Sequence, residues 1–88
     1  MSDLQRVENL YKLIANIQSV EECRLLFEDL CTYKEIENMA DRIYAAQLLM
    51  QGNTYNQVIE QTNVSSATLS RISRCVKYGQ GYKTMLNK

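Results

Sequence analysis

Small hydroxyl residues and arginines gather between residues 65 and 74, in a pattern suited to contact with phosphate groups and base edges. Hydroxyl groups donate to phosphates or bases, an Ala or Thr methyl packs against a thymine methyl, and a guanidinium binds a guanine edge or a phosphate. The first residues of the segment are small and carry no negative charge, so they could approach DNA closely. The candidate contact residues are Ser65, Ser66, Ala67, Thr68, Ser70, Arg71 and Arg74.

The surrounding residues 54–78 predict two short helices joined by a tight turn, the outline of a helix-turn-helix. Thr54 is a good N-cap for the first helix, and Gln57 stands three residues later, where it can close a capping box. Thr54 and Tyr55 open this helix, and we add both to the candidate DNA-binding residues. The tyrosine hydroxyl is a candidate for phosphate contact.

The turn and the second helix follow from the residues after this first helix. Asn63 is expected at the chain reversal, in the left-handed conformation that asparagine tolerates. Val64 is expected to pack between the two helices, and Ser65 can cap the second helix. An apolar stripe at spacings of three and four supports that helix; its members are Leu69, Ile72 and Val76.

The length of the chain and the distribution of its charges limit which classes of protein are possible. The 88 residues form one domain with no proline and three glycines, so we expect an all-α fold. Residues 1–53 hold five basic and nine acidic residues, a net charge of −4. Residues 54–88 hold five basic residues and one acidic residue, a net charge of +4. The positive half contains the predicted helix-turn-helix, which favours a DNA-binding end and a non-DNA end.

The residues that support catalysis or metal binding are scarce. The chain has no histidine, no glycine-rich phosphate loop and no nucleophile with an obvious base, so we expect no enzyme and no cofactor. Three cysteines without close spacing predict neither a zinc site nor a disulfide framework; reduced thiols in a cytoplasmic protein are expected. No apolar run is long enough to span a membrane.

Three helices are expected before the helix-turn-helix, over residues 3–17, 20–31 and 33–51, with Gly52 as the stop. The third helix is apolar nearly all round from Ile43 to Met50, which indicates burial on every side and cover by a second subunit. The expected organisation is one domain over residues 1–88. Its parts are dimerisation helices over 1–53, a helix-turn-helix over 54–78 and a tail over 79–88.

The order of helices and the strings LCTYKEIENMADR and SATLSR resemble the tryptophan repressor family, over residues 10–86. The resemblance is greatest to the branch of small Gram-positive bacterial proteins labelled YerC and YecD. It implies an intertwined all-helical homodimer that presents two helix-turn-helix units to successive major grooves of a palindromic operator.

The resemblance also implies a place for a small-molecule ligand. Residues that match the corepressor-binding positions of the family are Thr32, Arg42 and Arg71. A glycine of the family is replaced by Ile72, which is expected to fill the ligand space, and a serine is replaced by Cys75, a poor hydrogen-bonding substitute. We therefore expect that any small-molecule corepressor is not tryptophan.

These features predict a sequence-specific, DNA-binding transcriptional regulator, a repressor that binds double-stranded DNA as a homodimer. The alternative is a helical dimer that serves as a protein-interaction module without DNA binding, which the zero net charge favours. DNA binding that weakens as salt rises distinguishes the two, because only contacts to phosphates release counterions.

Overall fold

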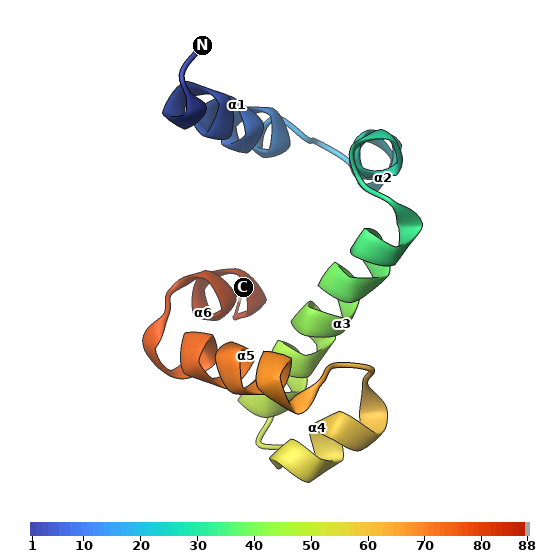
Figure 1. The fold of residues 1–88 in the computed structure, drawn as a ribbon, viewed down its shortest axis with the longest axis vertical. Coiled ribbons are helices and arrows are strands. Elements are labelled where there is room, and N and C mark those ends of the chain that lie inside the picture. The colour runs from blue at the N-terminus through green and yellow to red at the C-terminus, as the bar shows by residue number, and fades with distance from the viewer. Residues whose placement is uncertain (88) are drawn as a thin grey trace. The chain divides into compact units, whose positions relative to one another are not determined.

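The computed structural model describes residues 1–87, and over that range all of its regular structure is α-helical (Figure 1). The all-α prediction is confirmed, and each expected helix is present within two residues of its expected ends. The expected tail contains a short sixth helix. The helices are α1 (Asp3–Ala15), α2 (Val20–Leu30), α3 (Tyr33–Met50), α4 (Tyr55–Gln61), α5 (Ser66–Tyr78) and α6 (Gly81–Leu86).

The chain divides into two compact units, Met1–Tyr33 and Lys34–Lys88. This division places α3 with the helix-turn-helix, whereas the sequence suggested a boundary after residue 53. We call the two parts the N-terminal unit and the C-terminal unit, and describe each by itself.

The N-terminal unit consists of α1 and α2, and neither helix has a buried residue. Both helices begin at a serine cap: the hydroxyl of Ser2 accepts a hydrogen bond from the Gln5 amide, and the hydroxyl of Ser19 accepts one from the Glu22 amide. Large apolar side chains remain exposed, including Leu4 at 83%. The capping residues therefore define these helices without a core of their own to hold them.

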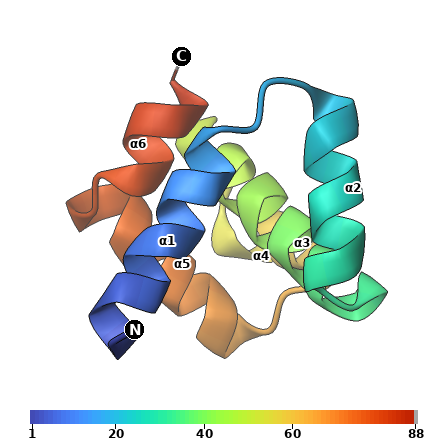
Figure 2. The same ribbon diagram turned by 90° about the horizontal axis from the view of Figure 1, so that it is seen from above.

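The C-terminal unit has a compact apolar core, built by α3, α4 and α5. Its buried members are Ala45, Ala46, Leu48, Val58, Leu69 and Ile72. Helix α6 lies beside α5 (Figures 1 and 2), and its side chains Tyr82 and Leu86 pack against this cluster. The two alanines let neighbouring helices approach α3 closely, since they add little bulk.

The end of α3 is set by Gly52, as the sequence predicts. Its φ of 95° lies in the left-handed region, which only glycine adopts at no steric cost. The amide of Gly52 donates to the Leu49 carbonyl at 3.0 Å, and the amide of Asn53 donates to the Leu48 carbonyl at 3.1 Å. This pair of bonds is a Schellman motif, which ends the helix and starts the chain toward α4.

The apolar run of α3 is only partly covered within its own unit. Ala45, Ala46 and Leu48 are buried, whereas Ile43 and Tyr44 are 45% and 44% exposed. The expectation of burial on every side therefore holds for one side of the helix in the single chain. None of the helices within residues 1–87 has the length and apolar character that crossing a membrane requires.

Candidate nucleic-acid interface

The helix-turn-helix has the caps that the sequence predicts at both of its helices. Thr54 accepts from the Gln57 amide while the Gln57 side chain accepts from the Thr54 amide at 2.8 Å, which completes the capping box of α4. The hydroxyl of Ser65 accepts from the Thr68 amide at 3.1 Å and caps α5. These hydroxyls have structural partners in the free protein, although both residues remain exposed and can still approach DNA.

The turn between α4 and α5 is built differently from the prediction. No residue other than glycine has a positive φ in the part of the chain that the structure describes, so Asn63 is not left-handed. The hydroxyl of Thr62 occupies the turn instead. It donates to the Val58 carbonyl at 2.8 Å and accepts from the Val64 amide at 3.5 Å. Thr62 is not among the predicted residues of the turn, because a threonine after a short helix has many other common uses.

The outward face of α5, which we call the reading helix, carries an exposed polar stripe. Ser66, Ser70 and Arg74 recur every fourth residue and are all exposed, so they lie on one face of the helix. Lys77 follows three residues later on the same stripe and is also exposed, although it is not among the predicted contact residues. The stripe therefore changes from hydroxyls at the N-terminal end to cations at the C-terminal end.

Thr68 lies differently from the rest of the predicted set. A candidate DNA contact should face solvent in the free protein, but Thr68 is half-buried, and its side-chain oxygen accepts a hydrogen bond from the Ser65 hydroxyl at 3.0 Å. It lines a hollow that Arg42 of α3 also lines. Ala67 and Arg71 are exposed but line the same hollow, so this part of the predicted site is turned toward α3.

The cations of the reading helix have no acidic partners. The ion pairs of Arg6 with Asp3 and of Arg24 with Glu21 both lie in the N-terminal unit, and within residues 1–87 no ion pair involves a cation of the reading helix. Arg71, Arg74 and Lys77 therefore keep their full charge available to an anion. Charge-assisted bonds to phosphate are stronger than bonds between neutral groups, so this arrangement suits a phosphate backbone.

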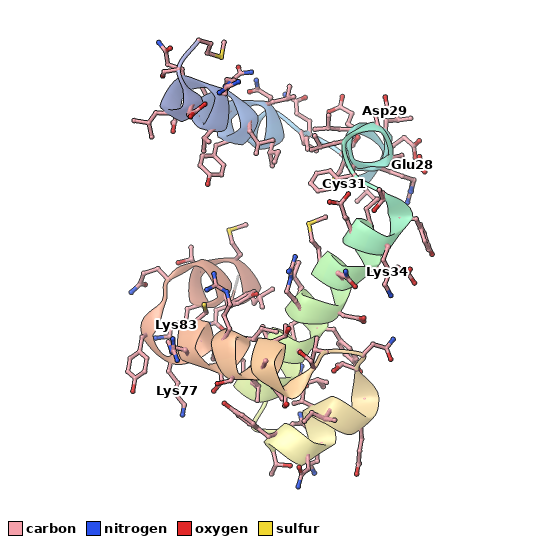
Figure 3. All side chains as sticks on the ribbon, viewed as in Figure 1. Glu28, Asp29, Cys31, Lys34, Lys77 and Lys83 are labelled. Carbon is pink, nitrogen blue, oxygen red and sulfur yellow. The ribbon has the colours of Figure 1, made fainter. Side chains whose placement is uncertain are left out.

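The C-terminal end of the reading helix is closed by two residues of the following segment. The amide of Gly79 donates to the Cys75 carbonyl at 2.8 Å, and a side chain at Gly79 would meet that same carbonyl oxygen. The ammonium of Lys83 donates to the Lys77 carbonyl at 2.7 Å (Figure 3). A cation at this end of a helix also interacts favourably with the helix dipole.

The space near Arg42 and Arg71 is open, contrary to the expectation that Ile72 fills it. Ile72 is only 2% exposed and packs into the core, forming part of the floor of a hollow of about 610 Å³. The lining consists of Arg42, Ala67, Thr68, Arg71, Ile72, Cys75 and Tyr82. The prediction for Ile72 is wrong for a physical reason: a branched side chain beside a cleft can turn inward when the core offers it contacts.

The two arginines of the predicted ligand set thus lie on one hollow, and neither has an ion-pair partner within residues 1–87. Thr32, the third member, belongs to the N-terminal unit, so its place beside this hollow stays a prediction. Among the described residues, no group of three His, Cys, Asp or Glu side chains could hold a metal ion.

Comparison with known proteins agrees with this geometry. The family model of the Trp repressor protein matches residues 5–88. The chain belongs to the Trp repressor family. This is a regulatory and non-enzymatic family, whose members bind DNA as dimers. The sequence resemblance to the family is therefore confirmed.

Two similar proteins match this chain over nearly all of its length. The uncharacterized protein YerC of Bacillus subtilis (strain 168) is 38% identical over 85 residues, which cover 96% of this chain and 82% of the relative. The crystal structure of a TrpR like protein from Eubacterium eligens ATCC 27750 has a TM-score of 0.87 and 36% identity. That alignment covers 94% of this chain and 87% of the other.

Proposed function

We propose that this member of the Trp repressor family is a sequence-specific transcriptional regulator that binds a palindromic operator as a homodimer and represses by occluding the promoter. The observation that carries the proposal is the exposed stripe of the reading helix. Hydroxyls at its N-terminal end suit base edges in the major groove, and unpaired cations at its other end suit phosphates.

The N-terminal unit supports the homodimer. Its two amphipathic helices contain no buried residue, and large apolar side chains such as Leu25, at 59% exposed, face solvent in the single chain. Apolar surface of this extent marks an interaction site in a folded protein. A second copy of the chain is the partner we propose, because a palindromic operator needs two reading helices related by two-fold symmetry.

DNA binding can be tested by placing a glutamate in the exposed stripe of the reading helix. Ser70 is exposed on the reading helix, so Ser70→Glu should leave the protein folded and should abolish binding, because a carboxylate would face the phosphates. The probe is a duplex enriched by the wild-type protein from a random-sequence pool, and the readout is fluorescence anisotropy. Thr84→Glu, an exposed change on α6, is the matched control and should retain affinity. Equal affinity for Ser70→Glu would remove this helix from the interface.

The alternative function, a protein-interaction module without DNA binding, is favoured by the net charge of zero. Salt dependence separates the two functions. For the DNA-binding protein, the logarithm of affinity should fall linearly with the logarithm of salt concentration, and Arg74→Gln should reduce that slope by about one phosphate contact. If no DNA is enriched at low salt, the interaction module is the better explanation.

The hollow beside the reading helix favours a small anionic effector as a separate proposal. Two guanidiniums without ion-pair partners, those of Arg42 and Arg71, line it, and the planar fork of a guanidinium matches a carboxylate. Tryptophan itself is not the ligand we expect. Its ammonium group would meet Cys75, whose thiol is a weak hydrogen-bonding group.

A further inference from the structure

The turn of the helix-turn-helix is closed by a side chain. Among the described main-chain hydrogen bonds outside the helices, none joins two residues of the segment 62–65. The backbone leaves α4 in an extended conformation, with Thr62 at a φ of −132° and a ψ of 173°. A turn without its own main-chain bond has to be held by side chains or by packing.

The hydroxyl of Thr62 is the polar group that holds this turn. It donates to the Val58 carbonyl at 2.8 Å, which fixes the hydroxyl on the last turn of α4, and it receives the Val64 amide at 3.5 Å, a longer and weaker bond that makes the link across the turn. Val58 is fully buried in the core, and Val64 packs against that core. The hydroxyl therefore ties the end of α4 to the residue from which the chain turns toward the reading helix.

We infer that Thr62 is a positioning residue: its hydroxyl sets the angle between α4 and the reading helix, and with it the fit of the exposed stripe to the major groove. Nothing in the backbone duplicates this role, because the turn has no left-handed residue to fix its direction. The inference rests on the proposed DNA binding for its functional half and on the turn geometry alone for its structural half.

Valine is the sharpest substitution because it keeps the branched shape of threonine and removes the hydroxyl. Thr62→Val should rotate the reading helix relative to α4, whereas Thr62→Ser should keep the wild-type orientation. Residual dipolar couplings of the α4 and α5 amides measure this angle directly in solution, in the intact chain. The same orientation in Thr62→Val and wild type would overturn the inference, whatever the affinity for DNA.

The second arm measures affinity for the duplex that the wild-type protein enriches from a random-sequence pool. Thr62→Val should bind about tenfold more weakly or worse, since sites lose function when they are held outside roughly 10–20° of the productive orientation. Thr62→Ser should restore binding. Thr84→Val makes the same chemical change at an exposed position of α6 and should have no effect.

A core variant tests whether Thr62 affects DNA binding only by stabilising the fold. Leu86→Ala removes packing at α6, far along the chain from the turn, and should lower the melting temperature while leaving affinity unchanged well below that temperature. If Thr62→Val rotates the helix but binds as tightly as wild type, Thr62 does not position it for reading and the inference fails. If the wild-type chain enriches no duplex, the proposed function fails, and the dipolar couplings still decide the structural role.

Discussion

The two units of this chain use apolar and charged side chains in opposite ways. The C-terminal unit buries an apolar core within one chain, although Ile43 and Tyr44 stay exposed, and it leaves the cations of its reading helix without acidic partners. The N-terminal unit leaves its apolar side chains exposed and pairs Arg6 and Arg24 with acids. The difference indicates a division of roles: one unit has a core of its own and cations open to an anion, and the other exposes apolar faces that the proposed second copy would cover.

The largest expected effect is on the core of the C-terminal unit. Leu69 is fully buried, so Leu69→Ala should lower the free energy of unfolding by about 2–5 kcal/mol through lost packing and the cavity left behind. At chain concentrations low enough to keep the protein monomeric, Leu25→Ala, at a position 59% exposed in α2, should change it by less than about 0.5 kcal/mol. Urea denaturation measures both, and equal losses would contradict the contrast between the units.

The next effect concerns the proposed partner of the N-terminal unit. Sedimentation equilibrium should report twice the chain mass of 10.2 kDa. Helix α1 carries Val7, Leu10 and Ile14 at spacings of three and four, which places them on one apolar face. Leu10→Glu puts a carboxylate on this face, where burial without a partner costs roughly 1–3 kcal/mol. The dimer dissociation constant should therefore rise by roughly ten- to hundredfold.

Asn9→Glu is the control for this test, because it adds the same charge to the polar face of α1. It should leave the association unchanged. A wild-type chain that is well folded and monomeric at micromolar concentration would refute the homodimer.

A smaller effect is expected at the bond that closes the reading helix. Lys83→Met removes the ammonium from the Lys77 carbonyl and should cost about 0.3–1 kcal/mol of unfolding free energy. Lys34→Met removes a cation from the first turn of α3, where the helix dipole disfavours it, so this variant should be neutral or slightly more stable. Thermal unfolding at low salt separates the two; a loss at Lys34 equal to that at Lys83 would contradict the assignment.

The smallest expected effect is that of tryptophan. Isothermal titration with millimolar tryptophan should show no binding heat, and DNA affinity should not depend on it. Cys75→Ser places a stronger hydrogen-bonding group at the hollow, so it tests whether the thiol is what prevents tryptophan from binding. Ile72→Gly is a poorer test, because it would also remove a core side chain. Micromolar binding of tryptophan by the wild-type chain would show that the Cys75 thiol is an adequate partner for the ammonium group.

Local chemistry made most of the fold predictable from sequence. Thr54, Ser65 and Gly52 each act where they stand in the chain, through bonds to residues at most four positions away, and all three were assigned correctly. The family resemblance rested on short strings and was likewise correct.

The errors arose where the answer depends on residues far apart in sequence. Whether Ile72 enters the core or the hollow depends on α3, and so does the half-buried position of Thr68. The turn was misassigned for a different reason: Asn63 and Thr62 both suit a reversal, and residue type alone does not decide which one closes it.

The core of the C-terminal unit has a consequence for the order of folding. All six of its buried apolar residues lie between Ala45 and Ile72, so the contacts that build it join segments close together in the chain. Such a topology folds quickly, and its rate does not depend on chain concentration. Two-chain assembly is a slower, concentration-dependent step. A newly synthesised chain should therefore present a formed reading helix before it meets a second copy.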